Sequence, residues 1–238
     1  MNIQRWAAAT GDILLGASCH GCGVAWWGIC PQCRATVAAQ PPYRTVPDPE
    51  PAGFPTTVAS APYDAVLRQV ISAHKDRQAL ALTGFLAERL AMSMHRLLVT
   101  SASRTAGREI TVVPVPSPAA VVRQRGFDAT WTLARRATVR LRAAHRLSAR
   151  RLLVQRRGVA DQSGLSAAQR MANLHDAFRL RPLARGHLRA TELVVLVDDV
   201  VTTGSSLSEA TRVLLGAGLD VLGAATIAAT VRRHPRRS

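Results

Sequence analysis

The stretch Val194-Val-Leu-Val-Asp-Asp-Val-Val-Thr-Thr-Gly-Ser-Ser206 decides the expected fold of this chain of 238 residues. Its leading apolar residues predict a buried parallel strand, because such strands are covered on both faces. Two carboxylates, Asp198 and Asp199, stand where that strand should end. A loop of small residues follows, and a helical pattern begins at Leu207. This order predicts an anion site, because the unpaired N–H groups and the dipole of a helix N-terminus favour a phosphate.

Hydroxyl groups gather in the loop that the anion would meet. Thr202, Thr203, Ser205 and Ser206 offer donors, and Gly204 lets the backbone approach the ligand closely. The two carboxylates would repel a phosphate, so they suit sugar hydroxyls or Mg²⁺ instead. The pattern therefore indicates a sugar phosphate. The alternative is an ordinary buried strand followed by a helix with a serine N-cap, which would not require two acids at a strand end.

The same stretch resembles the phosphoribosyl-diphosphate (PRPP) motif of type I phosphoribosyltransferases. That motif runs through four apolar residues, two acids, two apolar residues, two threonine-like residues, glycine, any residue and serine or threonine, and every position matches. The resemblance implies that the loop holds the 5-phosphate of PRPP while Asp198 and Asp199, as the catalytic pair, hold its ribose hydroxyls. The phosphate-binding residues so implied are Val200, Val201, Thr202, Thr203, Gly204, Ser205 and Ser206.

All four cysteines lie near the N-terminus as two CxxC pairs, Cys19 with Cys22 and Cys30 with Cys33. Seven residues separate the pairs, and this arrangement can place four thiolates around one tetrahedral Zn²⁺. Disulfides, a redox CxxC and a degenerate empty site are the alternatives. The first residues carry no secretory signal, so we expect a cytoplasmic chain, in which structural disulfides are disfavoured. The cysteines therefore predict a structural zinc module.

The chain is strongly basic, with a net charge of +16 and a single lysine, Lys75. Such a charge raises the expectation of nucleic acid or anionic ligands, but near-exclusive use of arginine is also what a GC-rich genome produces. Aromatic residues make up only 4%, which disfavours base stacking. No apolar run reaches the roughly 18 residues that span a bilayer. The arginines expected to form a surface for single-stranded DNA are Arg135, Arg136, Arg140, Arg142, Arg146, Arg150, Arg151 and those at 232–237.

Six prolines between residues 41 and 55 predict a stiff, extended linker. We therefore expect a zinc-binding module at 1–40, the linker at 41–55 and a phosphoribosyltransferase-like domain at 56–238. Beyond the linker, predicted strands and helices alternate, which is typical of an α/β fold with a parallel sheet flanked by helices. The expected strands are 56–60, 109–116, 152–155, 194–197 and 221–231, and the expected helices are 63–72, 79–98, 128–146 and 207–215.

Ligands of such a sheet lie at the carboxyl ends of its strands. The segment Pro114-Val-Pro116 and the acid pair Asp198/Asp199 both occupy such ends, so we expect them to face one crevice. The seven histidines are scattered, and His74 is expected at the surface.

The order of these pieces resembles the ComF family, of which ComFC is the best-known branch, over nearly the whole chain. The resemblance implies a phosphoribosyltransferase-like fold with an N-terminal zinc module. It also implies a link to the uptake of single-stranded DNA in natural transformation, beside a helicase-like ATPase. One departure is Asp128, where the family usually has asparagine. The segments that carry the resemblance are the cysteine module, 71–77, 114–116, 123–128, 156–178 and 198–206.

Two functions remain open at this point. The first is a phosphoribosyltransferase that binds PRPP with Mg²⁺, its diphosphate lying against the loop after Val115 and neutralised by Lys75 and Arg125. Its acceptor is not identified. The second is a non-catalytic single-stranded DNA binding or assembly factor of competence-type DNA uptake, built on a retained phosphate site.

Overall fold

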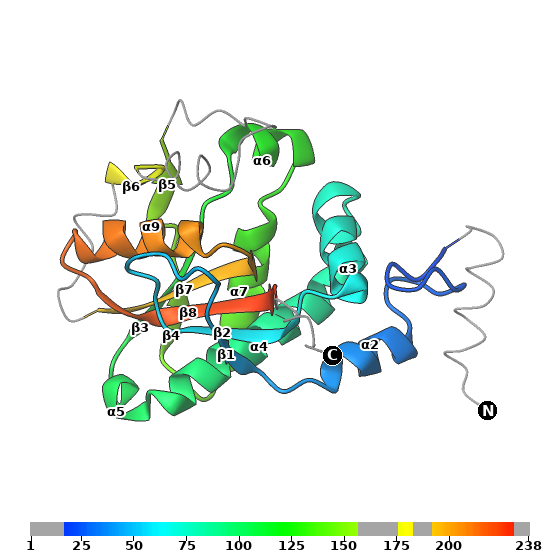
Figure 1. The fold of residues 1–238 in the computed structure, drawn as a ribbon, viewed down its shortest axis with the longest axis horizontal. Coiled ribbons are helices and arrows are strands. Elements are labelled where there is room, and N and C mark those ends of the chain that lie inside the picture. The colour runs from blue at the N-terminus through cyan, green and yellow to red at the C-terminus, as the bar shows by residue number, and fades with distance from the viewer. Residues whose placement is uncertain (1–16, 157–175, 183–191, 231–238) are drawn as a thin grey trace, which may run out of the picture.

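A computed structural model describes residues 17–156, 176–182 and 192–230 of the chain (Figure 1). Six of the described strands form one sheet, in the order β1-β2-β8-β7-β3-β4. All neighbouring strands are parallel except β1 and β2, which confirms the expected parallel α/β sheet. The strands are β1 (Tyr43–Thr45), β2 (Thr57–Pro62), β3 (Ile110–Pro114), β4 (Leu147–Ala149), β7 (Leu193–Val201) and β8 (Asp220–Ala229).

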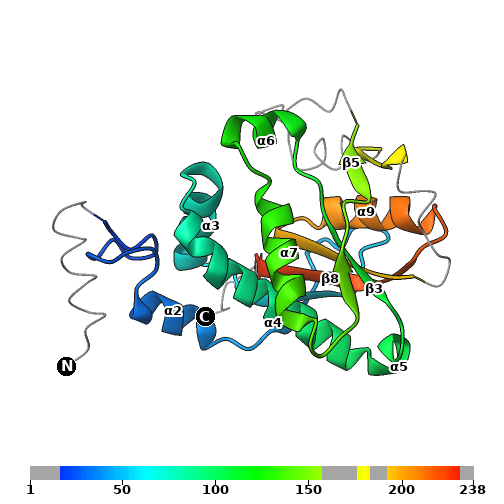
Figure 2. The same cartoon turned by 180° about the vertical axis from the view of Figure 1, so that it is seen from behind.

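Helices flank this sheet, with α4 and α7 behind it and α9 in front (Figures 1 and 2). Successive residues of β7 point to opposite faces, so Val195 joins the core under α4 and α7 while Val194 and Leu196 join the core under α9. Burial on both faces explains the continuous apolar run. The described helices are α2 (Pro31–Ala38), α3 (Ala65–Asp76), η1 (Leu80–Leu82), α4 (Thr83–Thr100), α5 (Ala102–Thr105), α6 (Ala119–Arg125), α7 (Ala129–Leu141) and α9 (Ser205–Leu215).

In the middle of the chain one helix is shorter than expected, and one expected strand lies outside the main sheet. The helix expected to reach residue 146 ends at Leu141, and Leu147 then begins the edge strand β4, where its side chain is buried. The strand expected at 152–155 is β5 (Leu153–Gln155), but it pairs antiparallel with β6 (Phe178–Leu180) outside the main sheet. The sequence pattern predicts that these residues form a strand, but tertiary packing decides which sheet the strand joins.

The proline-rich segment differs from the extended linker expected at 41–55. It contains β1, and its residues Pro47, Pro51 and Pro55 are buried against the domain. Tyr43 and Phe54 pack on the core under α9. We call residues 46–56 the strap; Figure 1 shows it crossing in front of β2 and β8 beside α9. The division of the chain at residues 40 and 55 itself stays a prediction.

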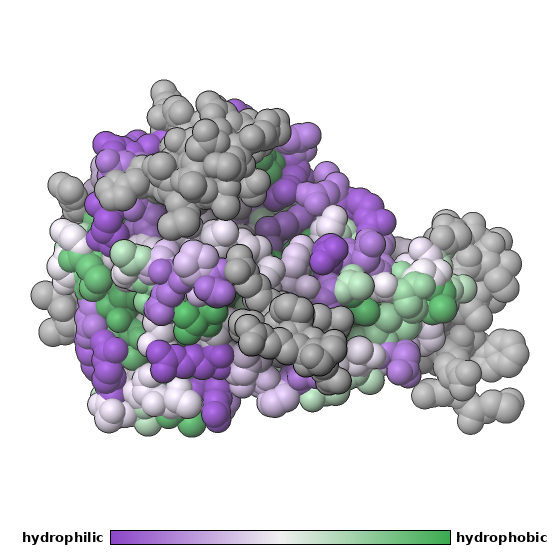
Figure 3. Space-filling view, viewed as in Figure 1, coloured by the Kyte–Doolittle hydropathy of each residue, from purple (hydrophilic) through white to green (hydrophobic). Residues whose placement is uncertain are grey.

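The cysteine-bearing turns share a core with the α/β domain rather than standing apart from it. Cys19, Cys30 and Cys33 are buried in the same apolar cluster as Leu67 of α3 and Leu82 of η1. Figure 3 shows apolar side chains gathered over these turns at one end of the molecule.

Some expectations fall on segments that the structure does not describe. They are the arginines at 232–237 and residues 157–175 of the segment 156–178. Among the described helices, none has the length and apolar content that a membrane crossing requires.

Candidate functional site

The ends of β3 and β7 meet as the sequence predicts. Pro114 of β3 lies opposite Val197 of β7, and the backbone N–H of Val115 donates to the carbonyl of Val197 (2.9 Å). The acid pair follows directly. However, β7 does not end at the acids, because Val200 and Val201 continue its pairing with β8. The acid pair therefore lies within the last part of the strand, where its backbone is fixed on the β8 side.

The loop after β7 has the form of an anion site. Gly204 takes the left-handed conformation (φ 75°) at the N-cap of α9, and no side chain caps the helix there. Thr202 and Thr203 are exposed, and the hydroxyl groups of Thr203 and Ser205 lie 3.1 Å apart. An uncapped helix N-terminus with hydroxyl donors beside it can take the oxygens of a phosphate.

Lys75 lies on the acid pair, although α3 is far from β7 in the sequence. Its Nζ contacts Oδ2 of Asp199, and the side chains of Lys75 and Asp199 are 23% and 10% exposed. The backbone N–H of Asp199 donates to Oδ1 of Asp198 (2.8 Å). One carboxylate oxygen of each acid is thus already engaged.

These contacts set the charge of the three groups. Burial opposes the charge of Asp199, but the ammonium of Lys75 outweighs it and lowers the pKa of Asp199. Burial and the neighbouring charge of Asp199 raise the pKa of Asp198 well above its usual range. Burial alone would lower the pKa of Lys75, but the two carboxylates raise it. The site therefore holds a Lys75–Asp199 ion pair beside a second carboxyl that resists ionisation.

Mg²⁺ prefers an open set of oxygen ligands in octahedral geometry. In the acid pair, Lys75 and the backbone N–H of Asp199 already engage one oxygen of each carboxylate, so only the other oxygen of each is open, beside the positive charge of Lys75. The pair is better suited to sugar hydroxyls, which can donate to the remaining carboxylate oxygens.

Arg125, expected on the diphosphate side, lies at the end of α6 and reaches back to α3. Its Nη2 donates to Oδ1 of Asp76 at 2.8 Å, directly beside Lys75. Val115 is buried at the head of the loop that leads to α6. The structure thus brings all three residues of the expected diphosphate side to the end of the sheet that carries the acid pair.

His74 is not at the surface, as we expected, but fully buried next to Lys75. Its Nε2 lies 3.1 Å from the hydroxyl oxygen of Thr83, its ring meets that of Phe127 edge-on, and its Nδ1 has no partner. Burial, then the positive charge of Lys75, lowers the pKa of His74 to about 4 from 6.5, against a smaller opposite effect of Asp199. His74 is therefore neutral at physiological pH.

We expect His74 to make the fold less stable in acid. Because its pKa is lowered on folding, only the unfolded chain takes up this proton as the pH falls from about 6.5 to about 4, and stability is lost across that window. Urea unfolding at about pH 7 and about pH 4.5 should show a loss up to about 2 kcal/mol larger in the wild type than in His74→Gln. Equal losses in the two proteins would show that His74 does not contribute.

The strap completes the loop side of the site, and nothing in its sequence indicated this. A Cβ atom built on Gly204 would lie 2.6 Å from Cε2 of Phe54 and 2.8 Å from Cγ of Pro47. The strap therefore packs directly on the turn that begins α9. Only the predicted need for glycine in that turn could have hinted at a close neighbour.

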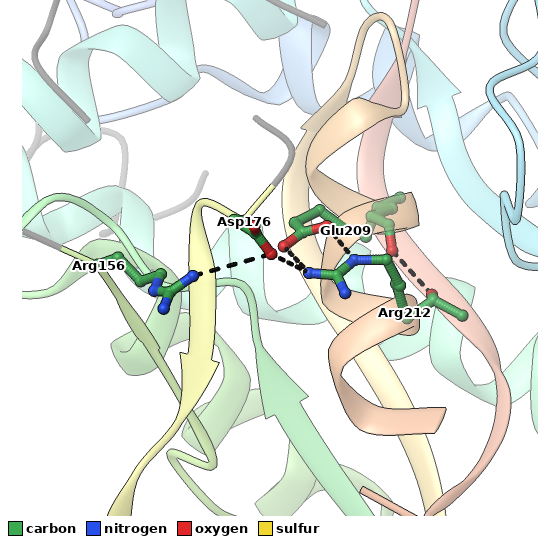
Figure 4. Close-up of polar contacts among 6 residues, drawn as sticks. Arg156, Asp176, Glu209 and Arg212 are labelled. Carbon is green, nitrogen blue, oxygen red and sulfur yellow. Dashed lines mark hydrogen bonds and ion pairs between the residues drawn. The ribbon is translucent and has the colours of Figure 1, made fainter. Parts of the chain in front are cut away.

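A network of ion pairs anchors α9 from the other side (Figure 4). Arg212 of α9 donates to Glu209 through Nε (2.7 Å) and Nη2 (2.8 Å), and its Nη2 also donates to Asp176 (2.8 Å). Arg156 lies 3.8 Å from the same Asp176 carboxylate. These ion pairs tie the ends of β5 and β6 to α9, the helix that begins at the candidate anion site.

Asp128 has a local role that accounts for its charge. Its Oδ1 accepts from the N–H of Trp131, which makes Asp128 the N-cap of α7, and its Oδ2 lies 3.2 Å from Nη2 of Arg151. The guanidinium of Arg151 also covers the Trp131 ring at 4.5 Å. The acid therefore does not leave an uncompensated charge beside the site.

Several arginines of the expected DNA surface are engaged within the protein. Arg146 pairs with Glu109 (3.0 Å), Arg150 with Glu192 (3.1 Å) and Arg151 with Asp128. Since α7 ends at Leu141, Arg146 does not continue the helical face that we expected. The helix itself still exposes Arg135, Arg136 and Arg140.

The four cysteines form a second candidate site, which can hold a metal ion such as zinc. Their sulfur atoms all lie within 4.8 Å of one another, and those of Cys22 and Cys30 are 3.6 Å apart. Backbone N–H groups of Gly21 and Cys30 point at the sulfur of Cys19 (3.3 Å each). Burial would raise the pKa of Cys19, but such backbone hydrogen bonds lower it to about 6. This geometry fits four thiolates on one tetrahedral ion.

Comparisons with known proteins agree with this architecture. The family model described as the phosphoribosyl transferase domain matches residues 128–237. The chain is 32% identical over 197 residues to "DNA utilization protein YhgH" of Escherichia coli strain K12, covering 80% of this chain and 79% of the relative. It is 30% identical over 200 residues to the protein of the same name from Salmonella typhimurium, with the same coverage.

Proposed function

Because this chain belongs to the ComF family of proteins with a phosphoribosyl transferase domain, we propose that it binds a 5-phosphoribosyl group, in its full form PRPP. The 5-phosphate would lie against the loop from Val200 to Ser206. The ribose hydroxyls would donate to Asp198 and Asp199. The diphosphate would lie toward Val115, Lys75 and Arg125. We include a cytoplasmic location and a structural Zn²⁺ on the four cysteines in the same proposal.

One observation carries the proposal: an uncapped helix N-terminus and a carboxylate pair stand side by side at the end of one strand. The first part suits a phosphate and the second part repels one. A ligand that fits both parts of the site must have an anionic end and a neutral middle that carries hydroxyl groups. Ribose 5-phosphate has this form, whereas a phosphodiester of single-stranded DNA lacks the vicinal hydroxyls.

Transfer of the phosphoribosyl group to an acceptor is the second part of the proposal. Positive charge develops on the ribose as diphosphate departs, so the chain would act by holding the sugar and by stabilising charge. In this proposal Asp198 and Asp199 would stabilise that positive charge, and Arg125 would stabilise the negative charge of the departing diphosphate. Mg²⁺, when bound with PRPP, would neutralise the diphosphate oxygens.

The proposal is tested by the change in melting temperature that PRPP produces. A ligand of the folded state raises the melting temperature, and Asp199→Asn removes a charge-assisted hydrogen bond worth about 1.5–3 kcal/mol, or about 10- to 150-fold in affinity. We expect a PRPP-dependent rise in the wild type and little or none in Asp199→Asn. Asp220→Asn is the control, because Asp220 lies at the opposite end of β8, paired with Arg104 and Arg108. No rise in any variant at millimolar PRPP would contradict the proposal.

A second candidate, binding of single-stranded DNA, is favoured by the printed name of the relatives and by the exposed arginines of α7. In this reading the protein would assist an assembly for DNA uptake, with an ATPase of helicase type as partner. The same melting experiment separates the two. DNA binding through phosphates should weaken steeply with salt, with a log–log slope of about −0.7 per phosphate, and should survive Asp199→Asn.

A further inference from the structure

The chain contains 30 arginines and one lysine, and the structure places that lysine on the acid pair. The ammonium of Lys75 contacts Asp199 in a setting where both side chains are largely buried. An ammonium is a compact charge on a flexible stem, whereas a guanidinium is a broad planar fork. The single lysine of the chain thus lies between α3 and the last part of β7, where its compact ammonium reaches a largely buried carboxylate.

We propose that Lys75 occupies the place of a divalent cation at the acid pair, as a built-in counter-ion. Without Lys75, a metal ion from solution would be the natural source of the positive charge that two adjacent carboxyl groups need in order to ionise together. Lys75 neutralises one of them, and the backbone N–H of Asp199 engages Oδ1 of the other. One oxygen of each carboxylate is left to accept from a hydroxyl group, and the ammonium of Lys75 repels a cation that approaches the pair.

The position of Lys75 is held from outside the pair. The following residue, Asp76, is fixed by Arg125 of α6 (2.8 Å). The preceding residue, His74, is buried against Phe127 and Thr83. The end of α3 is thus clamped on both sides of the lysine, which keeps its ammonium directed at Asp199. A side chain placed merely by chance on the surface would not have this support.

The proposal has a consequence for ligand binding, which rests on the proposed function. The acid pair should hold a ribose without a metal ion, so Mg²⁺ should matter only for the diphosphate. Ribose 5-phosphate, which carries no diphosphate, should therefore bind equally well with and without divalent cations. PRPP should gain affinity from Mg²⁺, but through the diphosphate rather than through Asp199.

Titration with Mn²⁺, followed by electron paramagnetic resonance on the zinc-loaded full chain without sugar phosphate, tests the proposal directly. We expect no Mn²⁺ site in the wild type or in Lys75→Arg at up to about 1 mM. In Lys75→Met the acid pair loses its counter-ion and should gain a Mn²⁺ site that binds at least about tenfold more tightly than the wild type does. The double variant Lys75→Met/Asp199→Asn should lose this site again. Lys75→Gln replaces Lys75→Met if the methionine variant does not fold.

Two results would overturn the proposal. One is a Mn²⁺ site in the wild type that disappears in Asp199→Asn, because the acid pair would then hold a metal ion despite Lys75. The other is a folded Lys75→Met or Lys75→Gln protein without any new site. Neither result depends on sugar binding, so failure of the proposed function is distinguishable: ribose 5-phosphate would then fail to bind the wild type in metal-depleted and Mg²⁺-containing buffer alike.

Discussion

Replacing Gly204 by alanine is expected to destabilise the protein by about 2–5 kcal/mol and to abolish binding of ribose 5-phosphate. The left-handed backbone (φ 75°) would cost an alanine about 1–2 kcal/mol. The new Cβ would also meet Phe54 at 2.6 Å and Pro47 at 2.8 Å, and overpacking of this kind costs about 1–3 kcal/mol. Relief of that clash must move the strap or the turn that begins α9. Urea unfolding and calorimetric titration measure the two effects.

Gly218 provides a matched control, because it has the same backbone conformation (φ 79°) with nothing within 4 Å of its added Cβ. Gly218→Ala should therefore lose only the stability that the strained backbone costs, about 1–2 kcal/mol, and should bind ribose 5-phosphate normally. Gly204→Ala/Phe54→Ala should relieve most of the clash. If Gly204→Ala and Gly218→Ala lost equal stability, the strap would not press on the loop as described.

Removal of metal from the cysteine cluster is expected to affect the whole protein. Pure protein should contain one zinc per chain, and Cys30→Ser should lose it along with the fold of the cysteine turns, since structural zinc in small modules contributes about 10–16 kcal/mol of folding free energy. Cys30 lies in the core that also holds Leu67 of α3. We therefore expect the melting temperature of the α/β domain to fall by several degrees as well, as measured by calorimetry.

His20→Ala is the control for the cysteine cluster, because His20 lies between two of the cysteines but is not a member of the sulfur cluster. This variant should keep its zinc and its melting temperature. Metal analysis that finds well below one zinc per chain in the wild type, with all four thiols free, would contradict the zinc assignment. A domain melting transition unchanged by Cys30→Ser would contradict the shared core.

The parts of the site that were predictable are local in sequence. The acid pair, the loop and the start of α9 lie within one stretch, and strand, turn and helix signals follow each other there without a gap. The cysteine cluster was likewise readable, because the CxxC spacing alone constrains where the sulfurs lie. The meeting of Pro114 and Val115 with Val197, next to the acid pair, followed from the rule that the carboxyl ends of parallel strands lie at one edge of the sheet.

The parts that were not predictable depend on contacts between distant segments. Prolines at 41–55 resemble a linker in composition, but the free edge of β2 and the open face beside α9 give the segment something to pack on. His74 is polar, yet the end of α3 turns it inward against Phe127. The Lys75–Asp199 pair joins the end of α3 to the last part of β7, and no spacing rule connects these two segments. In each case tertiary packing overrides the local pattern.

The central claim is that the loop after β7 holds the phosphate of a ribose phosphate. The most direct test is to titrate ribose 5-phosphate into isotope-labelled protein and to follow the backbone amide resonances. We predict large, saturable shifts of the amides of Thr203, Gly204, Ser205 and Ser206, which should be much weaker in Asp199→Asn because the sugar is no longer held. Amides of this loop that do not move at millimolar ligand, or shifts confined to the arginines of α7, would contradict the account.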